Sequence, residues 1–249
     1  MEKIILPANK MRINIKRKIF PEIGRHDRMT ILRDISFDVD PRSFLVLTGP
    51  SGCGKSTLLN IVAGLDKDFE GEILLGHHQP RITFIFQTPR LLPWRTIREN
   101  ISLSLPYDDP RLEKVDDILE RVGLLESMNA YPERTSLGMQ RRAALARGFI
   151  QEPDILLMDE PFVSLDEKTA FGLRELLITL WSSRPTTVLF VTHDLTEAVM
   201  LGTRILRLSG DSTNIDIDEI VRLSSEERTD PQKIKSEMGR IFSSHKKLS

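Results

Sequence analysis

Short, almost wholly apolar runs at residues 44–48, 155–158 and 188–191 predict buried parallel strands. Each run contains aromatic, leucine or β-branched residues and is followed at once by glycine or by polar residues. A fourth run, at residues 82–86, has the same character and stops at Gln87. Since ligands of open α/β sheets bind beyond the carboxyl ends of the strands, candidate chemistry is expected directly after these runs.

Helical spacing of apolar residues predicts helices between and after the strands. Residues 56–63 form one such pattern, and residues 136–151 form another among several arginines. The pattern at residues 109–124 begins with Asp109 as the N-cap and has proline in the first turn. Residues 88–153 as a whole are therefore predicted to be an all-helical insertion into an α/β core.

The C-terminal tail, residues 223–249, predicts a surface helix. Asp230 and the proline after it form a helix start, and Ile234, Met238 and Ile241 form one narrow apolar face that would dock on the core. The residues beyond the last core strand are too few for a separate regulatory domain.

Composition limits the class of protein. The 249 residues can form one α/β domain with an inserted subdomain. The formal net charge of -1 gives no global attraction to nucleic acid, so no nucleic-acid partner is expected. The single cysteine suits a reducing compartment. The apolar runs are too short for a signal peptide or a membrane-spanning helix, so work at a membrane would need a partner that holds the chain there.

The loop between the 44–48 strand and the 56–63 helix matches the phosphate-binding pattern G-x-x-x-x-G-K-[ST]. Its glycines let the backbone wrap a phosphate chain, its N–H groups donate to that chain, and Lys55 adds a positive charge. Ser56 would bind Mg²⁺. The residues predicted to hold the nucleotide are Gly49, Pro50, Ser51, Gly52, Cys53, Gly54, Lys55, Ser56 and Thr57.

Candidate catalytic residues follow the other two strands. Asp159 and Glu160 end the 155–158 run, where two buried carboxylates would be costly without a task. Asp159 can hold Mg²⁺ through its water shell, and Glu160 can orient or deprotonate the attacking water. His193 shares the strand edge where the γ-phosphate should lie. No Cys/His grouping has metal-site spacing, so Mg²⁺ brought with a nucleotide is the only metal expected.

The order of the motifs resembles the ATPase subunit of ATP-binding cassette (ABC) transporters. These motifs are GPSGCGKST, FIFQ, TSLGMQRRAALAR, DILLMDEP, SLD and VTHD. The resemblance implies an α/β fold, a P-loop NTPase core of the RecA-like type with an antiparallel β part and an inserted helical subdomain. It assigns residues 11–87 and 154–222 to the nucleotide-binding core, 88–153 to the helical subdomain with the signature motif, and 223–249 to a C-terminal helical tail.

The same resemblance implies ATP hydrolysis with Mg²⁺ in a head-to-tail dimer that holds two ATP molecules between its chains. Glu160, His193 and Gln87 of one chain would be catalytic, and the Mg²⁺ ligands would be Ser56, Gln87 and Asp159. Phe20 is the candidate for stacking under the adenine ring.

Residues of the second chain would complete each site. Ser136 and Gly138 would close on the γ-phosphate, and Asp166 would sit at the seam. Leu137 stands where the family signature usually has its first glycine. Either the dimer accommodates this side chain, or turnover is slow, or the chain pairs with a different ATPase subunit.

The segment after Gln87 suggests the membrane partner. Leu91, Leu92, Pro93 and Trp94 place apolar surface in a region that, in the family, receives the coupling helices of permease subunits. A local hydrophobic plug is the alternative. Residues 86–101 resemble most closely the importers of nitrate, sulfonates, taurine or related small solutes. Such importers also use an extracytoplasmic substrate-binding protein, and their ATPase subunits lie at the cytoplasmic face of the membrane.

Two alternatives remain open at this point. A non-transport ABC ATPase of the DNA-repair type would need a long coiled coil between Gln87 and the signature, where this chain has only a short insertion. A nucleotide-binding subunit with weak or no turnover is possible if Leu137 blocks catalysis.

Overall fold

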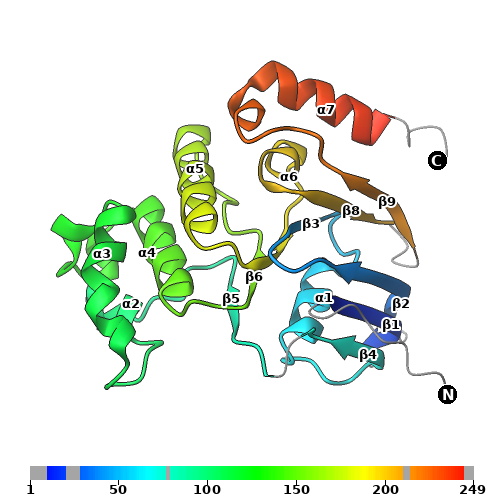
Figure 1. Ribbon diagram of the computed structural model, residues 1–249. Coiled ribbons are helices and arrows are strands. Elements are labelled where there is room, and N and C mark those ends of the chain that lie inside the picture. The colour runs from blue at the N-terminus through cyan, green and yellow to red at the C-terminus, as the bar shows by residue number, and fades with distance from the viewer. Residues whose placement is uncertain (1–9, 21–28, 77–78, 210–213, 244–249) are drawn as a thin grey trace. The chain divides into compact units, whose positions relative to one another are not determined.

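The computed structural model describes residues 10–20, 29–76, 79–209 and 214–243 (Figure 1). The chain forms two compact units. The first comprises Met1–Pro80 and Thr186–Ser249, and the second comprises Arg81–Pro185.

The first unit contains a three-stranded antiparallel sheet in the order β2-β1-β4. Its strands are β1 (Met11–Phe20), β2 (Met29–Val39) and β4 (Glu70–Leu74). Buried and less buried residues alternate along the first half of β1, as expected for a strand with one face on a core. The predicted antiparallel β part is thereby confirmed.

Four further strands of the first unit lie in the order β7-β3-β8-β9. They are β3 (Phe44–Thr48), β7 (Thr187–Val191), β8 (Arg204–Leu208) and β9 (Ile215–Ile220). β3 is parallel to both β7 and β8, whereas β9 is antiparallel to β8. All five residues of β3 and of β7 are buried, which explains why both strands are continuous apolar runs in the sequence.

Helices α1 (Lys55–Val62), α6 (Leu195–Leu201) and α7 (Pro231–Ser243) belong to the same unit. The predicted C-terminal helix is α7, which lies beside α6 (Figure 1). Its residues Ile234 and Ile241 are buried, and Met238 accepts a hydrogen bond from Thr196 of α6. The prediction that the tail helix docks on the core is confirmed.

The second unit holds a parallel pair of strands, β5 (Ile82–Ile85) and β6 (Ile155–Asp159). Every regular element between them is helical among the described residues, as predicted. These elements are α2 (Ile97–Ser102), a 3₁₀ helix at Pro110–Lys114, α3 (Val115–Arg121), 3₁₀ turns at Leu125–Ser127 and Pro132–Arg134, and α4 (Leu137–Phe149). Helix α5 (Glu167–Ser183) follows β6.

Side-chain caps fix where these helices begin. Thr96 and Glu99 form a capping box at α2. Asp109, Ser136 and Asp166 each accept a hydrogen bond from a backbone N–H group in the first turn that follows them. Asp109 and Ser136 therefore begin the two predicted helical segments, although the segment after Asp109 starts as a 3₁₀ helix.

Candidate active site

The loop after β3 has the backbone conformation that its glycines permit. Gly49 has φ 143°, and Gly54, the N-cap of α1, has φ 89°. A Cβ atom at Gly54 would lie 2.7 Å from Leu32 Cδ2, and one at Gly49 would lie 2.8 Å from both Cys53 Sγ and the Leu208 carbonyl oxygen. Side chains at these two positions would thus be strained by backbone conformation and by lack of space.

Lys55, the first residue of α1, folds back over this loop. Its Nζ atom donates to the carbonyl oxygens of Gly49 at 2.9 Å and Pro50 at 2.8 Å. A phosphate group in the loop would offer this ammonium group a charged acceptor in place of two neutral ones. Cys53 is buried, and burial raises the pKa of its thiol, so this residue is not a thiolate at neutral pH.

Phe20 lies at the end of β1, in the same unit as the loop. The Nζ atom of Lys18 stands 5.0 Å from the centroid of the Phe20 ring and donates to Asp66, while Phe20 is 40% exposed. Lys18 pairs with Leu32 of β2, the residue that packs against Gly54. The structure therefore brings the end of β1 to the phosphate-binding loop, which is where an adenine platform would be needed.

His193 lies two residues after the end of β7, and its side chain is exposed. Leu47 of β3 is paired with Val191 of β7, and both strands end within one residue of this pair. His193 and Gly49 thus follow the carboxyl ends of two adjacent parallel strands, which is the edge where α/β sheets bind ligands.

In the second unit, Gln87, Asp159 and Glu160 lie at the carboxyl end of another pair of strands. Ile85, the last residue of β5, is paired with Met158 of β6; Asp159 ends β6, Glu160 follows it, and Gln87 lies two residues after β5. Glu160 has φ 43°, a left-handed conformation that is unfavourable for a residue other than glycine. Such outliers gather at functional sites, where the surrounding structure holds them in place.

The signature residues begin α4. Ser136 is the N-cap, and its Oγ atom accepts from the Met139 N–H group at 3.2 Å. A Cβ atom at Gly138 would lie 2.9 Å from Thr169 Cγ2, so glycine allows α4 to pack closely on α5. Leu137 is 41% exposed within this chain. The Leu137 side chain therefore lies on the surface of the second unit and not in its core.

Asp166 is the N-cap of α5. Its carboxylate accepts from the Thr169 N–H group at 3.0 Å, and the hydrogen bonds from Thr169 lower the pKa of Asp166. The residue predicted to sit at a dimer seam thus begins the helix against which Gly138 packs.

Sequence reasoning missed two residues that hold the loops of this unit. Arg147 of α4 donates to the carbonyl oxygens of Pro89 at 2.6 Å and Arg90 at 2.8 Å, just after Gln87. Asn100 of α2 is fully buried and binds both backbone groups of Leu92. Arg147 is one of several arginines in its helix, and Asn100 is one of several polar residues in its own. The sequence therefore did not distinguish either residue from a solvent-exposed side chain.

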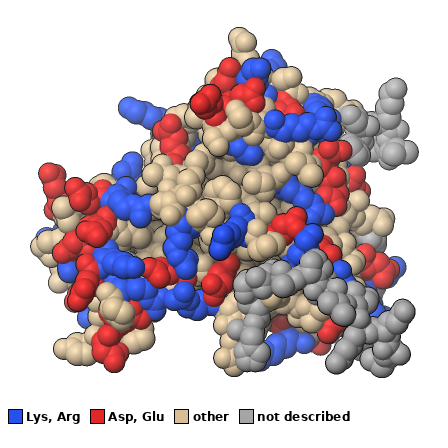
Figure 2. All heavy atoms as spheres, viewed as in Figure 1, with Lys and Arg blue, Asp and Glu red and all other residues tan. Residues whose placement is uncertain are grey.

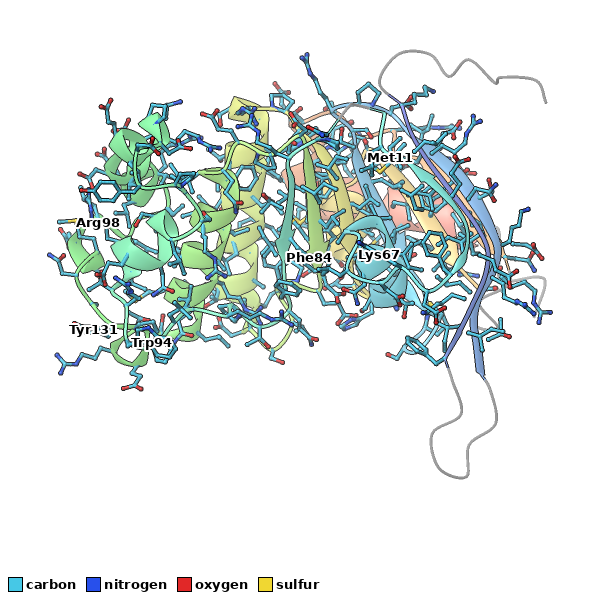
Figure 3. The ribbon with its side chains drawn as sticks, turned by 90° about the horizontal axis from the view of Figure 1, so that it is seen from below. Met11, Lys67, Phe84, Trp94, Arg98 and Tyr131 are labelled. Carbon is cyan, nitrogen blue, oxygen red and sulfur yellow. The ribbon has the colours of Figure 1, made fainter. Side chains whose placement is uncertain are left out.

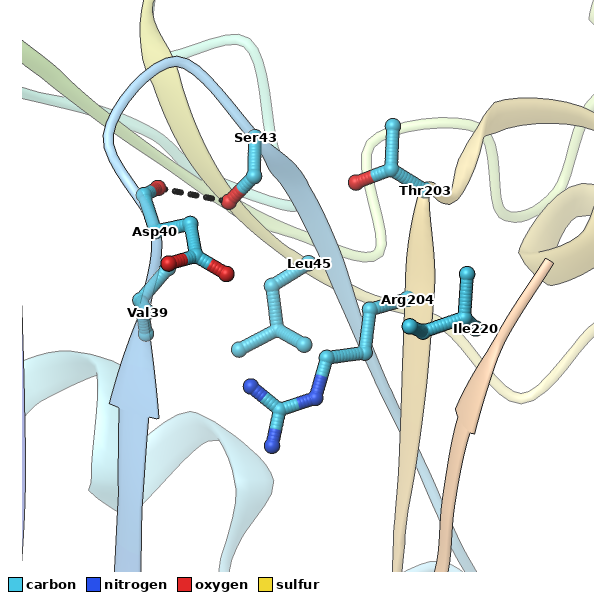
Figure 4. Close-up of a pocket in the computed structure, with 7 residues that line it drawn as sticks. All are labelled: Val39, Asp40, Ser43, Leu45, Thr203, Arg204 and Ile220. Carbon is cyan, nitrogen blue, oxygen red and sulfur yellow. Dashed lines mark hydrogen bonds between the residues drawn. The ribbon is translucent and has the colours of Figure 1, made fainter.

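A pocket of about 210 Å³ lies near the amino end of β3, away from the phosphate-binding loop (Figure 4). It is lined by Val39, Asp40, Ser43, Leu45, Thr203, Arg204 and Ile220. Ser43 and Leu45 lie at the amino end of β3, whereas the phosphate-binding loop follows its carboxyl end. The pocket therefore contains none of the predicted site residues.

Comparison with known families decides the family of this chain. A family model described as "ABC transporter" matches residues 32–163, more than half of the chain. The chain belongs to the ABC transporter family. This match confirms the resemblance read from the motifs and, with it, the ATPase class of the protein.

Named relatives of this ABC protein are import subunits. The "Aliphatic sulfonates import ATP-binding protein SsuB" of Bacillus subtilis (strain 168) is 44% identical over 199 residues, covering 78% of this chain and 77% of the relative. The SsuB 2 protein of Burkholderia lata is 43% identical over 213 residues, covering 84% of this chain and 76% of the relative. The predicted importer branch is confirmed by these matches.

Solved ABC structures share the fold. A dimeric structure of MJ0796, described as a bacterial ABC transporter cassette, has a TM-score of 0.72 and 30% sequence identity. It covers 86% of this chain and 100% of its own. A post-hydrolysis state of the same cassette, bound to ADP and Pi, has a TM-score of 0.71. The predicted P-loop NTPase fold is confirmed.

Proposed function

We propose that this ABC subunit binds ATP with Mg²⁺ and uses its hydrolysis to drive import of a sulfonate or a related small solute such as taurine or nitrate. The observation that carries the nucleotide part is the loop after β3, with Lys55 turned onto its carbonyl groups. The solute class rests on the relatives, whose names give aliphatic sulfonates as the imported solute.

Different residues of the chain would carry out different steps of ATP hydrolysis. Lys55 and the N–H groups at the start of α1 bind the phosphate chain. Glu160 accepts the proton of the attacking water as the water oxygen bonds to the γ-phosphorus. The bond from that phosphorus to the β–γ bridging oxygen breaks, and ADP and inorganic phosphate are released. His193 would contact the γ-phosphate from the end of β7.

The residues present fit a magnesium ion that comes with the nucleotide. Among the described residues, no three or more His, Cys, Asp or Glu side chains gather into a metal site of their own. Ser56, Gln87 and Asp159 would supply a hydroxyl, an amide oxygen and a carboxylate, the hard oxygen ligands that Mg²⁺ prefers beside phosphates. The ion would neutralise charge that develops on the phosphate oxygens.

A second copy of the chain would complete each ATP site. The N-terminus of α4 at Ser136 presents N–H groups and the positive end of a helix dipole, which suit a γ-phosphate supplied from another chain. Gly138 would lie close to the same phosphate, and Asp166 would lie at the seam. A homodimer is proposed because the exposed Leu137 leaves the helix start intact.

The surface around Trp94 is the proposed contact for permease subunits. Trp94 is 68% exposed and Tyr131 is 44% exposed, and both lie at the same end of the helical part in Figure 3. Hydrogen bonds from the Ile97 and Arg98 N–H groups to the carbonyl oxygens of Ala130 and Met128 join the two segments that carry these rings. An exposed aromatic patch on a fixed backbone is typical of a protein contact.

Such a contact would hold the subunit at the cytoplasmic face of the membrane. No helix in the described part of the chain is long and apolar enough to cross a bilayer. On the face shown in Figure 2, basic and acidic side chains are interspersed among the described residues. The exposed side chain of Trp94 is the candidate for attachment to the permeases. An extracytoplasmic substrate-binding protein would deliver the solute.

The test is ATP hydrolysis by the purified chain as a function of its own concentration, with Glu160→Gln as the blank. Specific activity that rises with concentration supports a site shared by two chains. Specific activity that is flat and above the blank contradicts the dimer. Uptake of labelled aliphatic sulfonate, taurine and nitrate by cells that carry the chain or its Glu160→Gln variant then identifies the solute class, and equal uptake in both would contradict the import role.

A further inference from the structure

The Thr192 hydroxyl joins two residues that follow His193 in the chain. Thr192 comes directly after β7 and is only 2% exposed. Its Oγ1 atom donates to Glu197 Oε2 at 2.6 Å and accepts from the Asp194 N–H group at 3.0 Å. The Thr192 hydroxyl thus donates one hydrogen bond and accepts another at the same time. The bond that it accepts links Thr192, the residue before His193, to Asp194, the residue after it.

The same short segment is tied to its neighbours on both sides. The Thr192 N–H group donates to the Leu47 carbonyl oxygen at 3.2 Å, two residues before Gly49 begins the phosphate-binding loop. Asp194 caps α6 by accepting from the N–H groups of Thr196 at 2.7 Å and Glu197 at 3.3 Å. Backbone hydrogen bonding to β3 and capping of α6 thus fix residues 192–194.

Glu197 contributes a buried carboxylate to this arrangement. It is 7% exposed on α6, and a carboxylate in that setting is unfavourable unless donors reach it. Thr192 is one such donor, and a hydrogen bond to an ionised acceptor is stronger than one between neutral groups. An apolar residue at this position would avoid the desolvation, so the carboxylate is expected to have a task.

We infer that Thr192 and Glu197 are positioning residues for His193 in ATP hydrolysis. The inference rests on the proposed catalytic role of His193. The backbone on either side of His193 sets where its side chain begins, and so affects where the exposed ring can reach. A displacement of about 1 Å at a catalytic group can lower the rate by about 100-fold, which makes such anchoring effective.

The test compares two threonines at the two ends of β7: Thr187 is its first residue, and Thr192 comes directly after its last. Thr192→Val keeps the side-chain shape and removes the hydroxyl, whereas Thr192→Ser keeps the hydroxyl. The matched control is Thr187→Val at the other end of β7, where Thr187 Oγ1 accepts from the Arg42 N–H group at 3.0 Å and the residue is 8% exposed. Both valine variants should lower the melting temperature by a similar amount.

The rate of ATP hydrolysis should distinguish Thr192→Val from Thr187→Val. We expect Thr192→Val to lower kcat for ATP by at least about tenfold with KM changed less than about twofold, while Thr187→Val and Thr192→Ser stay near the unmodified chain. Glu197→Gln should also stay near it because the amide oxygen can accept from Thr192, whereas Glu197→Met should lose activity. Equal kcat in Thr192→Val and Thr187→Val would overturn the inference.

A double-mutant cycle with His193→Ala distinguishes positioning from a general structural effect. If Thr192 acts through His193, Thr192→Val causes no further loss in the His193→Ala background, measured by single turnover with excess protein. The same fold loss in both backgrounds would refute the positioning role. Wild-type activity in His193→Ala would remove the basis of the inference while leaving ATP hydrolysis in place. Absence of hydrolysis by the unmodified chain would contradict the proposed function itself.

Discussion

Arg147 holds the backbone of Pro89 from 58 residues away in the sequence. Its guanidinium group donates to the Pro89 carbonyl oxygen at 2.6 Å and to the Arg90 carbonyl oxygen at 2.8 Å. Arg90 in turn lies over the Phe86 ring at 3.5 Å from its centroid. The loop after Gln87 is therefore fixed to α4, the helix that begins at the signature residue Ser136.

Arg147→Met should weaken the use of Mg²⁺ if Gln87 is one of its ligands. Methionine keeps much of the apolar stem but removes both hydrogen bonds, so the loop loses its anchor. We expect the Mg²⁺ concentration for half-maximal ATPase activity to rise about tenfold, the ratio that one charge-assisted hydrogen bond of about 1.5 kcal/mol represents. A titration of activity with Mg²⁺ at saturating ATP measures this shift.

Arg142→Met is the matched control on the same helix. Arg142 donates to the Val122 carbonyl oxygen at 3.2 Å, a partner outside the loop after Gln87. An equal shift in the two variants would show that α4 stability, and not the loop anchor, controls the Mg²⁺ response.

Leu137→Gly tests what the unusual signature costs. The Leu137 side chain is exposed in the single chain and would face the second subunit in a closed dimer. We expect kcat to rise by between about two- and tenfold, the latter equal to roughly 1.4 kcal/mol of transition-state stabilisation. The melting temperature should fall slightly, because glycine in a helix is about 1 kcal/mol less favourable than residues such as leucine.

If kcat of Leu137→Gly rises while its melting temperature falls, general stabilisation of the chain is excluded as the cause of the faster rate. Leu137→Ala separates side-chain volume from backbone freedom, since alanine removes volume without adding flexibility. Unchanged kcat in both variants would mean that the dimer accommodates leucine here without loss.

The phosphate-binding loop could be predicted from the sequence because its chemistry is contiguous. Gly49, Gly54 and Lys55 lie within a stretch of seven residues that leads from a strand into the first residue of a helix, and both elements are visible as patterns. The buried strands β3, β6 and β7 were predictable for a related reason, since a strand buried on both faces is a short apolar run.

The residues that hold the site in place could not be predicted in the same way. Arg147 and Lys18 act through partners that only tertiary contacts bring near: Lys18 donates to Asp66, 48 residues away, and Arg147 donates to Pro89, 58 residues away. Asn100 binds the nearby backbone of Leu92, Arg95 and Thr96, but its burial depends on the packing of α2. Nothing in the local pattern around such residues distinguishes them from solvated polar side chains. The Thr192–Glu197 pair is closer in sequence, but its hydrogen bond depends on the angle between the end of β7 and the start of α6.

The stability of the second unit, which contains Asp109, should depend on pH through the carboxyl group of this residue. Hydrogen bonds from the Arg111 side chain and N–H group lower the pKa of Asp109 from 3.8 to about 2. A carboxyl group whose pKa is lower in the folded state stabilises the fold above its unfolded pKa, and this contribution is lost as the pH falls through the folded value. Asp109→Asn should therefore lower the melting temperature most at neutral pH.

The difference between wild type and Asp109→Asn should shrink as the pH is lowered from about 4 towards about 2. Thermal unfolding followed by circular dichroism across this range measures it. Asp108→Asn, at the preceding exposed position, controls for removal of one negative charge. A difference that is the same at every pH would mean that the cap acts through the shape of the side chain and not through its charge.

Asn100 offers the most direct test of the proposed permease contact. It is fully buried, accepts from the Leu92 N–H group at 2.7 Å, and donates to the carbonyl oxygens of Leu92, Arg95 and Thr96 at 3.0 to 3.1 Å. Asn100→Asp keeps the shape but replaces the donor amide by a carboxylate that faces those carbonyl groups. We expect the free energy of unfolding to fall by about 3 kcal/mol, the upper range for leaving buried polar groups unpaired.

The functional result should be separable from this loss of stability. Below the melting temperature, the isolated Asn100→Asp chain should retain its basal ATPase activity, because the hydrogen bonds of Asn100 go to Leu92, Arg95 and Thr96, none of which is a predicted catalytic residue. Stimulation of that activity by permease subunits in proteoliposomes should be lost, because the backbone that presents Trp94 is no longer held. Asn14→Asp on β1 controls for the added charge, and full stimulation of Asn100→Asp would place the permease contact elsewhere on the chain.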